Sequence, residues 1–306
     1  MKKAFKIIIP VFIVLVVIVT TIIIISVKRN NKEYYMNFEK DYSIIYEELP
    51  TMDVSIYSTN PDSSLFNIDK IVSCSLYNLV DRYNIRVNEC VDSDNTYELN
   101  NRIYYECILN FNLDFSSDGF IPIDNCYMEI IFNTNEKLKV KIGNICFTKA
   151  TYEDHIKIKK VQSIVNSLGE FTSLTAIAIQ IESKEDVKIT NIIPISNTIS
   201  INNQYLLVNE NITDIDNSTP CTEIFGENYS CFKSSYESFK QININNKELQ
   251  LIIPLTYNNK EFVDSLGLII EYSIDGSNYK QIVNSYKLFS TTDVLYFAYE
   301  YELSKI

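Results

Sequence analysis

The sequence lacks tryptophan, and its 306 residues include one histidine, His155, and only six glycines. A hydrolase of the Ser/His/Asp type needs an imidazole base, so His155 is the sole candidate. No G-x-S-x-G, H-E-x-x-H or Walker-type motif accompanies it. The acidic stretch from Asp92 to Glu98 begins like a calcium-binding loop, but Tyr97 stands where such loops need glycine. The sequence therefore predicts no catalytic residue, no metal site and no cofactor.

Cysteine spacings typical of redox or zinc sites are also missing. The seven cysteines include no C-x-x-C pair, and none has zinc-ligand spacing with the histidine. Cys221 and Cys231 flank a short polar stretch, and in an exported domain we expect a disulfide between them; the alternative is two free thiols. Cys107 and Cys126 fall on apolar strand faces, where they are either buried thiols or a core cross-link.

Positive charge is scarce beyond the N-terminus. All six basic residues of the first 32 flank one apolar run, and residues 33–306 carry 21 basic and 39 acidic residues. A surface with this excess of negative charge repels nucleic acid and anionic lipid headgroups. We therefore expect no nucleic-acid partner.

The longest uncharged run extends from Ile7 to Val27, and 17 of its 21 residues are Ile, Val, Leu or Phe. A helix of this length spans roughly 31 Å, which matches a bilayer core of about 30 Å. A cleaved signal peptide is the alternative, but it needs a shorter run and a small-x-small cleavage site. We expect a transmembrane anchor at residues 7–27 after a short basic tail at residues 1–6.

The charges beside this run do not decide its orientation. Lys2, Lys3 and Lys6 precede it, and Lys28, Arg29 and Lys32 follow it, so the positive-inside rule nearly balances. A short basic tail before an apolar run is how export signals begin. We therefore expect a single-pass protein of the cell membrane with a cytoplasmic N-terminus and an extracytoplasmic bulk; a bulk that faces the cytoplasm is the alternative.

The first half mixes helical and strand patterns. Apolar residues at helical spacing predict a juxtamembrane helix within residues 28–50 and a second helix over residues 60–84, for which a strand through residues 70–80 competes. Alternating residues predict antiparallel strands at residues 103–115, 126–132 and 138–147, with a bulge at Gly143. A linking helix within 151–168 ends this part, so residues 51–168 are expected to form an α+β domain.

The second half, residues 169–306, consists of short apolar or alternating runs separated by turn residues. Asp275-Gly276 is a strong hairpin signal. This pattern predicts an all-β sandwich of the immunoglobulin or fibronectin type. The stretch from Val208 to Cys231 is its longest polar interval, so we expect a surface excursion there and a contact surface.

Together these patterns favour a membrane-anchored extracytoplasmic binding or scaffold protein without catalytic activity, which contacts an unknown protein partner at the cell surface or in an envelope assembly. The layout of one anchor and two small domains resembles bitopic scaffold subunits of conjugation or secretion channels, although their second domain also carries a helix. A surface hydrolase that uses paired carboxylates is the other alternative.

Overall fold

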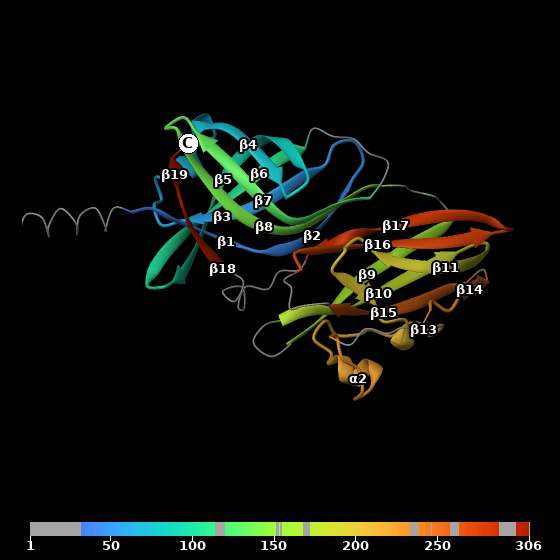
Figure 1. Ribbon diagram of the computed structural model, residues 1–306. Coiled ribbons are helices and arrows are strands. Elements are labelled where there is room, and N and C mark those ends of the chain that lie inside the picture. Colours follow the sequence, from blue (N-terminus) through green and yellow to red (C-terminus); the bar gives the residue numbers. More distant parts are fainter. Residues whose placement is uncertain are drawn as a thin grey trace, which may run out of the picture.

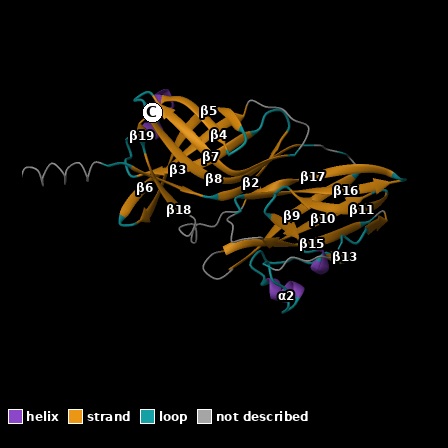
Figure 2. Ribbon diagram, in the orientation of Figure 1, coloured by secondary structure: helices purple, strands orange, loops and turns teal. Residues whose placement is uncertain are grey.

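The computed structural model describes residues 32–113, 120–150, 153, 155–167, 172–232, 238–245, 247–257, 263–287 and 298–305. Their structure is mostly β, in two units that lie end to end (Figures 1 and 2). The anchor expected at residues 7–27 lies outside the described residues. Within the described part, no helix has the length and the apolar sequence that a membrane crossing requires.

The first unit is one ten-stranded, strongly curled sheet with the strand order β18-β1-β3-β6-β5-β4-β7-β8-β19, and β2 pairs in parallel with β8. The C-terminal segment supplies the strands at both ends of this order, because β18 pairs with β1 and β19 pairs with β8. The strands are β1 (Tyr34–Phe38), β2 (Lys40–Tyr46), β3 (Thr51–Ser58), β4 (Ile71–Tyr77), β5 (Arg82–Leu99), β6 (Arg102–Leu113), β7 (Ile121–Phe132), β8 (Glu136–Lys149), β18 (Ala298–Glu302) and β19 (Ser304–Lys305).

The second unit is a sandwich of two sheets. One has the order β12-β15-β10-β9 with β13 also on β15, and the other has the order β14-β11-β16-β17. Its elements are β9 (Ile156–Ser167), β10 (Thr172–Ser183), β11 (Asp186–Pro194), β12 (Ile199–Ile201), β13 (Leu207–Asn209), the short helix α2 (Cys221–Phe225), β14 (Ile242–Asn245), β15 (Glu248–Tyr257), β16 (Ser265–Ile274) and β17 (Ser277–Lys287).

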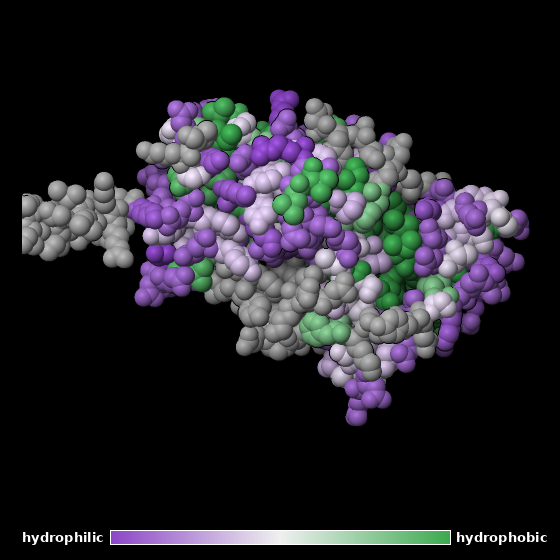
Figure 3. All heavy atoms as spheres, in the orientation of Figure 1, coloured by the Kyte–Doolittle hydropathy of each residue, from purple (hydrophilic) through white to green (hydrophobic). Residues whose placement is uncertain are grey.

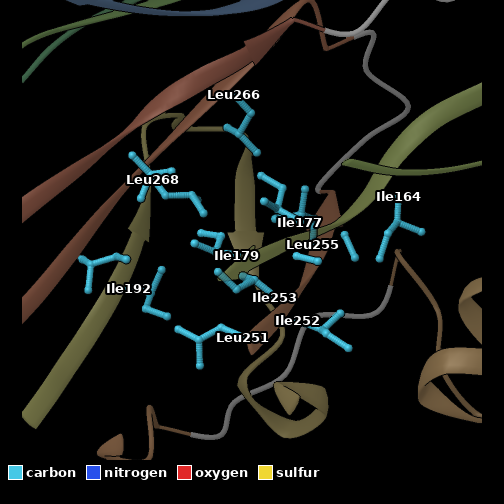
Figure 4. Packing of buried hydrophobic residues seen from close by; sticks show 14 of the residues in the cluster. Ile164, Ile177, Ile179, Ile192, Leu251, Ile252, Ile253, Leu255, Leu266 and Leu268 are labelled. Carbon is cyan, nitrogen blue, oxygen red and sulfur yellow. The ribbon is translucent and has the colours of Figure 1, made fainter. Parts of the chain in front are cut away.

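Aliphatic side chains fill the space between these two sheets. Leu251 and Ile253 of β15 lie opposite Ile192 of β11 and Leu268 of β16 (Figure 4). Nine of the ten residues of β15 are buried, and residues of the segment that contains β13 and α2 belong to the same core cluster. Ile252 and Tyr257 of β15 share this cluster with Phe225 of α2.

Several strand predictions are confirmed. β6, β7 and β8 cover the described residues of the three predicted runs, and Cys107, Leu109, Phe111 and Leu113 are fully buried on the predicted face of β6. The ladder between β7 and β8 is irregular around the pair Cys126 and Gly143, as the expected bulge requires. Asp275 and Gly276 adopt positive φ in the turn between β16 and β17.

Three helix predictions are wrong. Residues 34–46 form strands β1 and β2, and all of β1 after its first residue is buried. The apolar residues at helical spacing are therefore only some of the buried residues in this stretch. Residues 60–84 form two 3₁₀ turns (Ser64–Phe66 and Ile68–Lys70), strand β4 and the start of β5, so the competing strand was correct. The expected linking helix is β9, which pairs with β10 over its whole length. The described first unit is therefore β rather than α+β.

Strand β2 joins the two units. It pairs with β8 on one side, and on the other side Ser43 exchanges hydrogen bonds with the Ser265 hydroxyl of β16 at 3.1 and 3.2 Å. Lys40 also forms a salt bridge with Asp264 (3.0 Å). A small apolar cluster lies at the same place, and Figure 3 shows apolar atoms on the visible surface where the units meet.

Candidate functional site

A pocket of about 530 Å³ lies beside α2 on the second unit. This volume is within the range of ordinary ligand sites. Its lining is mainly apolar, with four polar side chains among the walls. The residues that line it are Val165, Asn166, Ser218, Pro220, Cys221, Thr222, Tyr229, Ser230, Cys231 and Phe232.

One wall of the pocket is held against the edge of β9. The Val165 amide donates to the carbonyl of Asn217 (2.7 Å), and the Asn166 side chain donates to the carbonyl of Thr219 (2.9 Å). The Asn166 side-chain oxygen also accepts from the amide of Cys221 (2.7 Å), the first residue of α2. The segment from Asn217 to Cys221 thus forms hydrogen bonds with the open edge of β9 and places α2 beside it.

The opposite wall is tied to β15. Tyr229 is buried, and its hydroxyl donates to the carbonyl of Leu255 (2.8 Å). The carbonyl of Cys231 accepts from the amide of Tyr257 (2.8 Å). α2 ends at Phe225 and is followed by Gly226, whose φ of +92° lets the chain turn back toward β15. The pocket walls are therefore fixed by backbone hydrogen bonds on both sides, and an apolar side chain could enter without reordering the loop.

The predicted cysteine pair lies in this pocket. Cys221 and Cys231 are both buried, line the same cavity and are free thiols in this structure. Hydrogen bonding with Cys231, together with burial, raises the pKa of Cys221, so that it stays protonated at neutral pH. The two residues line one pocket and interact with each other, and the disulfide between them stays a prediction.

The other predicted pair, Cys107 and Cys126, is not brought together in this way. Both are fully buried free thiols, but β6 and β7 are separated by two strands in the sheet. The Cys107 thiol lies 3.4 Å from the carbonyl of Leu65 and interacts with Cys90 on the neighbouring β5. Sequence reasoning missed Cys90 because nothing in its local pattern indicates a partner 17 positions away.

The remaining candidate residues lie at the surface. His155 Nδ1 is 3.3 Å from Glu185, and its ring packs on Tyr279 with centroids 4.7 Å apart. Asp92 accepts a weak hydrogen bond from the amide of Asp94 (3.3 Å) within an irregular part of β5. Over the residues that the structure describes, no three His, Cys, Asp or Glu side chains form a group able to hold a metal ion.

Comparisons with known proteins identify no family. No family model and no curated protein matches the chain. Among solved structures, the C-terminal domain of the Streptococcus agalactiae AgI/II polypeptide BspA aligns at 8% identity and a TM-score of 0.20 over 82% of this chain and 97% of that one. The D00-D0 domain of Intimin aligns at 8% identity and a TM-score of 0.20 over 84% and 100%. TM-scores this low carry no argument about fold or function.

Proposed function

We propose that this chain is a non-catalytic binding protein, fixed in the cell membrane by residues 7–27 with its bulk outside the cytoplasm, which takes an apolar side chain of a protein partner into the pocket beside α2. The observation that carries the proposal is the pocket itself, with apolar walls held open by hydrogen bonds to β9 and β15. Polar side chains at its rim supply the few oriented contacts that give such pockets specificity.

A peptide selection on the full chain in lipid nanodiscs tests the binding role. We expect the selected peptides to share one large aliphatic or aromatic residue, because only such a side chain fills an apolar cavity. Thr222→Trp should block the pocket and weaken their binding at least about tenfold. Thr134→Trp, in the exposed turn between β7 and β8, is the matched control and should leave binding unchanged.

Two outcomes would contradict this proposal. Selected peptides that bind the Thr222→Trp protein as well as the unmodified one would remove the pocket from the function. Turnover of a hydrolase substrate that is lost on changing Asp216 or Glu223, two exposed acids near the pocket, would favour the enzyme instead.

Protease treatment of intact cells tests the expected orientation. Residues 33–306 should be digested from outside while a cytoplasmic control protein survives. Survival of this part in intact cells, with digestion after lysis, would place it on the cytoplasmic side.

A further inference from the structure

The turn between β4 and β5 presents two apolar side chains to solvent. Leu79 is 105% exposed and Val80 is 87% exposed. The turn is rigid, because the Asn78 side-chain oxygen accepts from the amides of Val80 and Asp81 (both 2.8 Å) and the Asn78 amide donates to the carbonyl of Asp81 (3.0 Å). Burying one such side chain is worth about 1.5–3 kcal/mol. We call residues 78–81 the tip.

Aromatic and basic side chains surround the base of the tip. Tyr77 and Tyr127 stack with ring centroids 5.8 Å apart, and the Lys139 ammonium lies 5.0 and 4.7 Å from the two centroids. The Arg82 guanidinium lies 4.9 Å from the Tyr77 centroid and bonds Glu129 (3.1 Å). With Lys137, which lies 3.9 Å from Glu129, three cations face the acids Glu129 and Asp81. This surface therefore has a positive excess in an acidic protein.

The surroundings of the pocket have the opposite charge. Residues 208–232 contain five acidic residues and no lysine or arginine. Two of the acids, Glu210 and Asp214, bind Lys247 and Lys160. Asp216, Glu223 and Glu227 are exposed in the same segments that line the pocket. A partner with an apolar tip and positively charged side chains around it would complement the pocket in both shape and charge.

From this complementarity we propose that the Leu79–Val80 tip of one copy inserts into the pocket beside α2 of a neighbouring copy. The inference rests on the proposed function, in which the pocket takes an apolar side chain. Such a contact joins different surfaces of two identical chains, so it is heterologous and builds an open row unless the rotation between copies closes a ring.

The position of the two surfaces fits a row of copies that stand side by side. The tip lies at the end of the first sheet where β4 meets the start of β5, near the end of β6 at Leu113. The pocket lies on the second unit near α2. In Figure 1, β4 is on the upper side of the molecule and α2 on the lower side. Opposite sides are what a head-to-tail row requires.

The register of the first sheet argues against lipid as the occupant. β1 enters beside Ser58, which pairs with Tyr105 near the start of β6. The tip lies at the other end of the same sheet. If residues 7–27 are in the membrane, the tip points away from that membrane, so it cannot enter the bilayer that holds its own chain.

Mixing two variants of the full chain in detergent tests the contact. Leu79→Asp with Val80→Asp removes the apolar tip, and Thr222→Trp blocks the pocket. Each variant alone should stay monomeric by mass photometry where the unmodified chain forms oligomers, because each lacks one half of the contact. An equimolar mixture should form dimers only, since one intact tip and one intact pocket remain per pair. Monomers in the mixture, or oligomers of either variant alone, would overturn the proposal.

A cross-link locates the contact at the native thiols. Leu79→Cys should form disulfide-linked dimers and longer oligomers on addition of glutathione disulfide: each bond joins the new thiol to Cys221 or Cys231 and releases two glutathione thiols. Cys221→Ser with Cys231→Ser should abolish these cross-linked species. Val72→Cys on β4, where Val72 is 66% exposed, is the matched control and should give none. Equal cross-linking of the Leu79→Cys and Val72→Cys variants would contradict the proposed contact.

The outcomes separate this inference from the function on which it rests. If peptides bind the pocket but the mixed variants stay monomeric, the inference fails and the binding role stands. If neither peptide binding nor oligomers depend on Thr222, both fail. Flotation with anionic liposomes that is lost on changing the tip, but not on blocking the pocket, would assign the tip to lipid and overturn the proposal.

Discussion

The two units bury their interiors in chemically different ways. The second unit packs mainly aliphatic side chains from two sheets, and none of its described residues that are buried is charged. The first unit, by contrast, includes a buried carboxylate network, and the two buried charged side chains of the described residues, Asp41 and Glu106, both belong to it. A core without charged groups is insensitive to pH near neutrality, whereas a buried carboxylate links folding to protonation. We therefore expect the two units to respond differently to acid and to core mutations.

The seam between the units is where the largest effect is expected. Gly143 on β8 has φ +119°, and a Cβ atom there would lie 2.1 Å from the carbonyl oxygen of Lys40 on β2. Gly143→Ala must therefore push β2 off β8, and we expect a loss of about 4 kcal/mol or more in the free energy of unfolding. Chemical denaturation of the full chain in detergent, with hydrogen exchange of β2, measures it.

A matched glycine separates the clash from backbone strain. Gly276 also has positive φ (+84°), but a Cβ atom there would meet nothing within 4 Å. Gly276→Ala should cost only about 1–2 kcal/mol, since left-handed strain alone remains. Equal losses for the two variants would show that the parallel β2–β8 pairing is not what Gly143 protects.

The aliphatic core of the second unit should give the next largest effect. Leu251 is fully buried on β15, and its neighbour across the ladder, Val208 on β13, is 41% exposed. Leu251→Ala leaves a cavity and should lose about 3 kcal/mol, whereas Val208→Ala should lose less than about 0.5 kcal/mol. Hydrogen exchange resolved by strand is the measurement, and faster exchange confined to the first unit after Leu251→Ala would break the comparison.

The local sequence pattern predicted those strands of the fold that have one buried face. β6, β7 and β8 alternate apolar and polar residues, and the hairpin at Asp275-Gly276 carries its own turn chemistry. β1 buries residues of both parities, because one side packs with the large core cluster through Tyr35 and the other with Phe38, Tyr57 and Tyr104. Without alternation, a helix and a strand cannot be distinguished by period.

The candidate site was predictable to a similar degree. The polar stretch from Val208 to Cys231 marked a surface excursion, and the spacing of its two cysteines marked them as neighbours. The other wall, Val165 and Asn166, comes from a strand about fifty residues earlier, so no local pattern joins it to the loop. The Leu79–Val80 tip falls within residues 60–84, where the sequence predicted a helix, because two adjacent apolar residues fit a buried helix as well as an exposed turn.

Acid should distinguish the two units through Glu106. Its carboxylate accepts from the hydroxyls of Tyr57 (2.8 Å) and Ser93 and from the side chain of Asn95 (2.8 Å). Burial alone would raise the pKa of Glu106, but these hydrogen bonds together lower it below its usual value. The stabilisation is therefore complete above the unfolded-state pKa of about 4.3 and is lost as pH falls through the lower folded-state value.

Glu106→Gln should remove this dependence and should also weaken the first unit at pH 7 by about 1–3 kcal/mol, because an amide nitrogen replaces one acceptor oxygen among donors. Hydrogen exchange of β3, β5 and β6, compared with β10 and β15 between pH 3 and pH 7, measures both effects. Glu182→Gln is the matched control: the Glu182 pKa is also lowered, chiefly by its hydrogen bond with Lys159, but the side chain is 35% exposed, and solvent screening leaves such pairs little effect on stability. If the strands of both units lose protection together on acidification, the buried carboxylate does not set the difference between them.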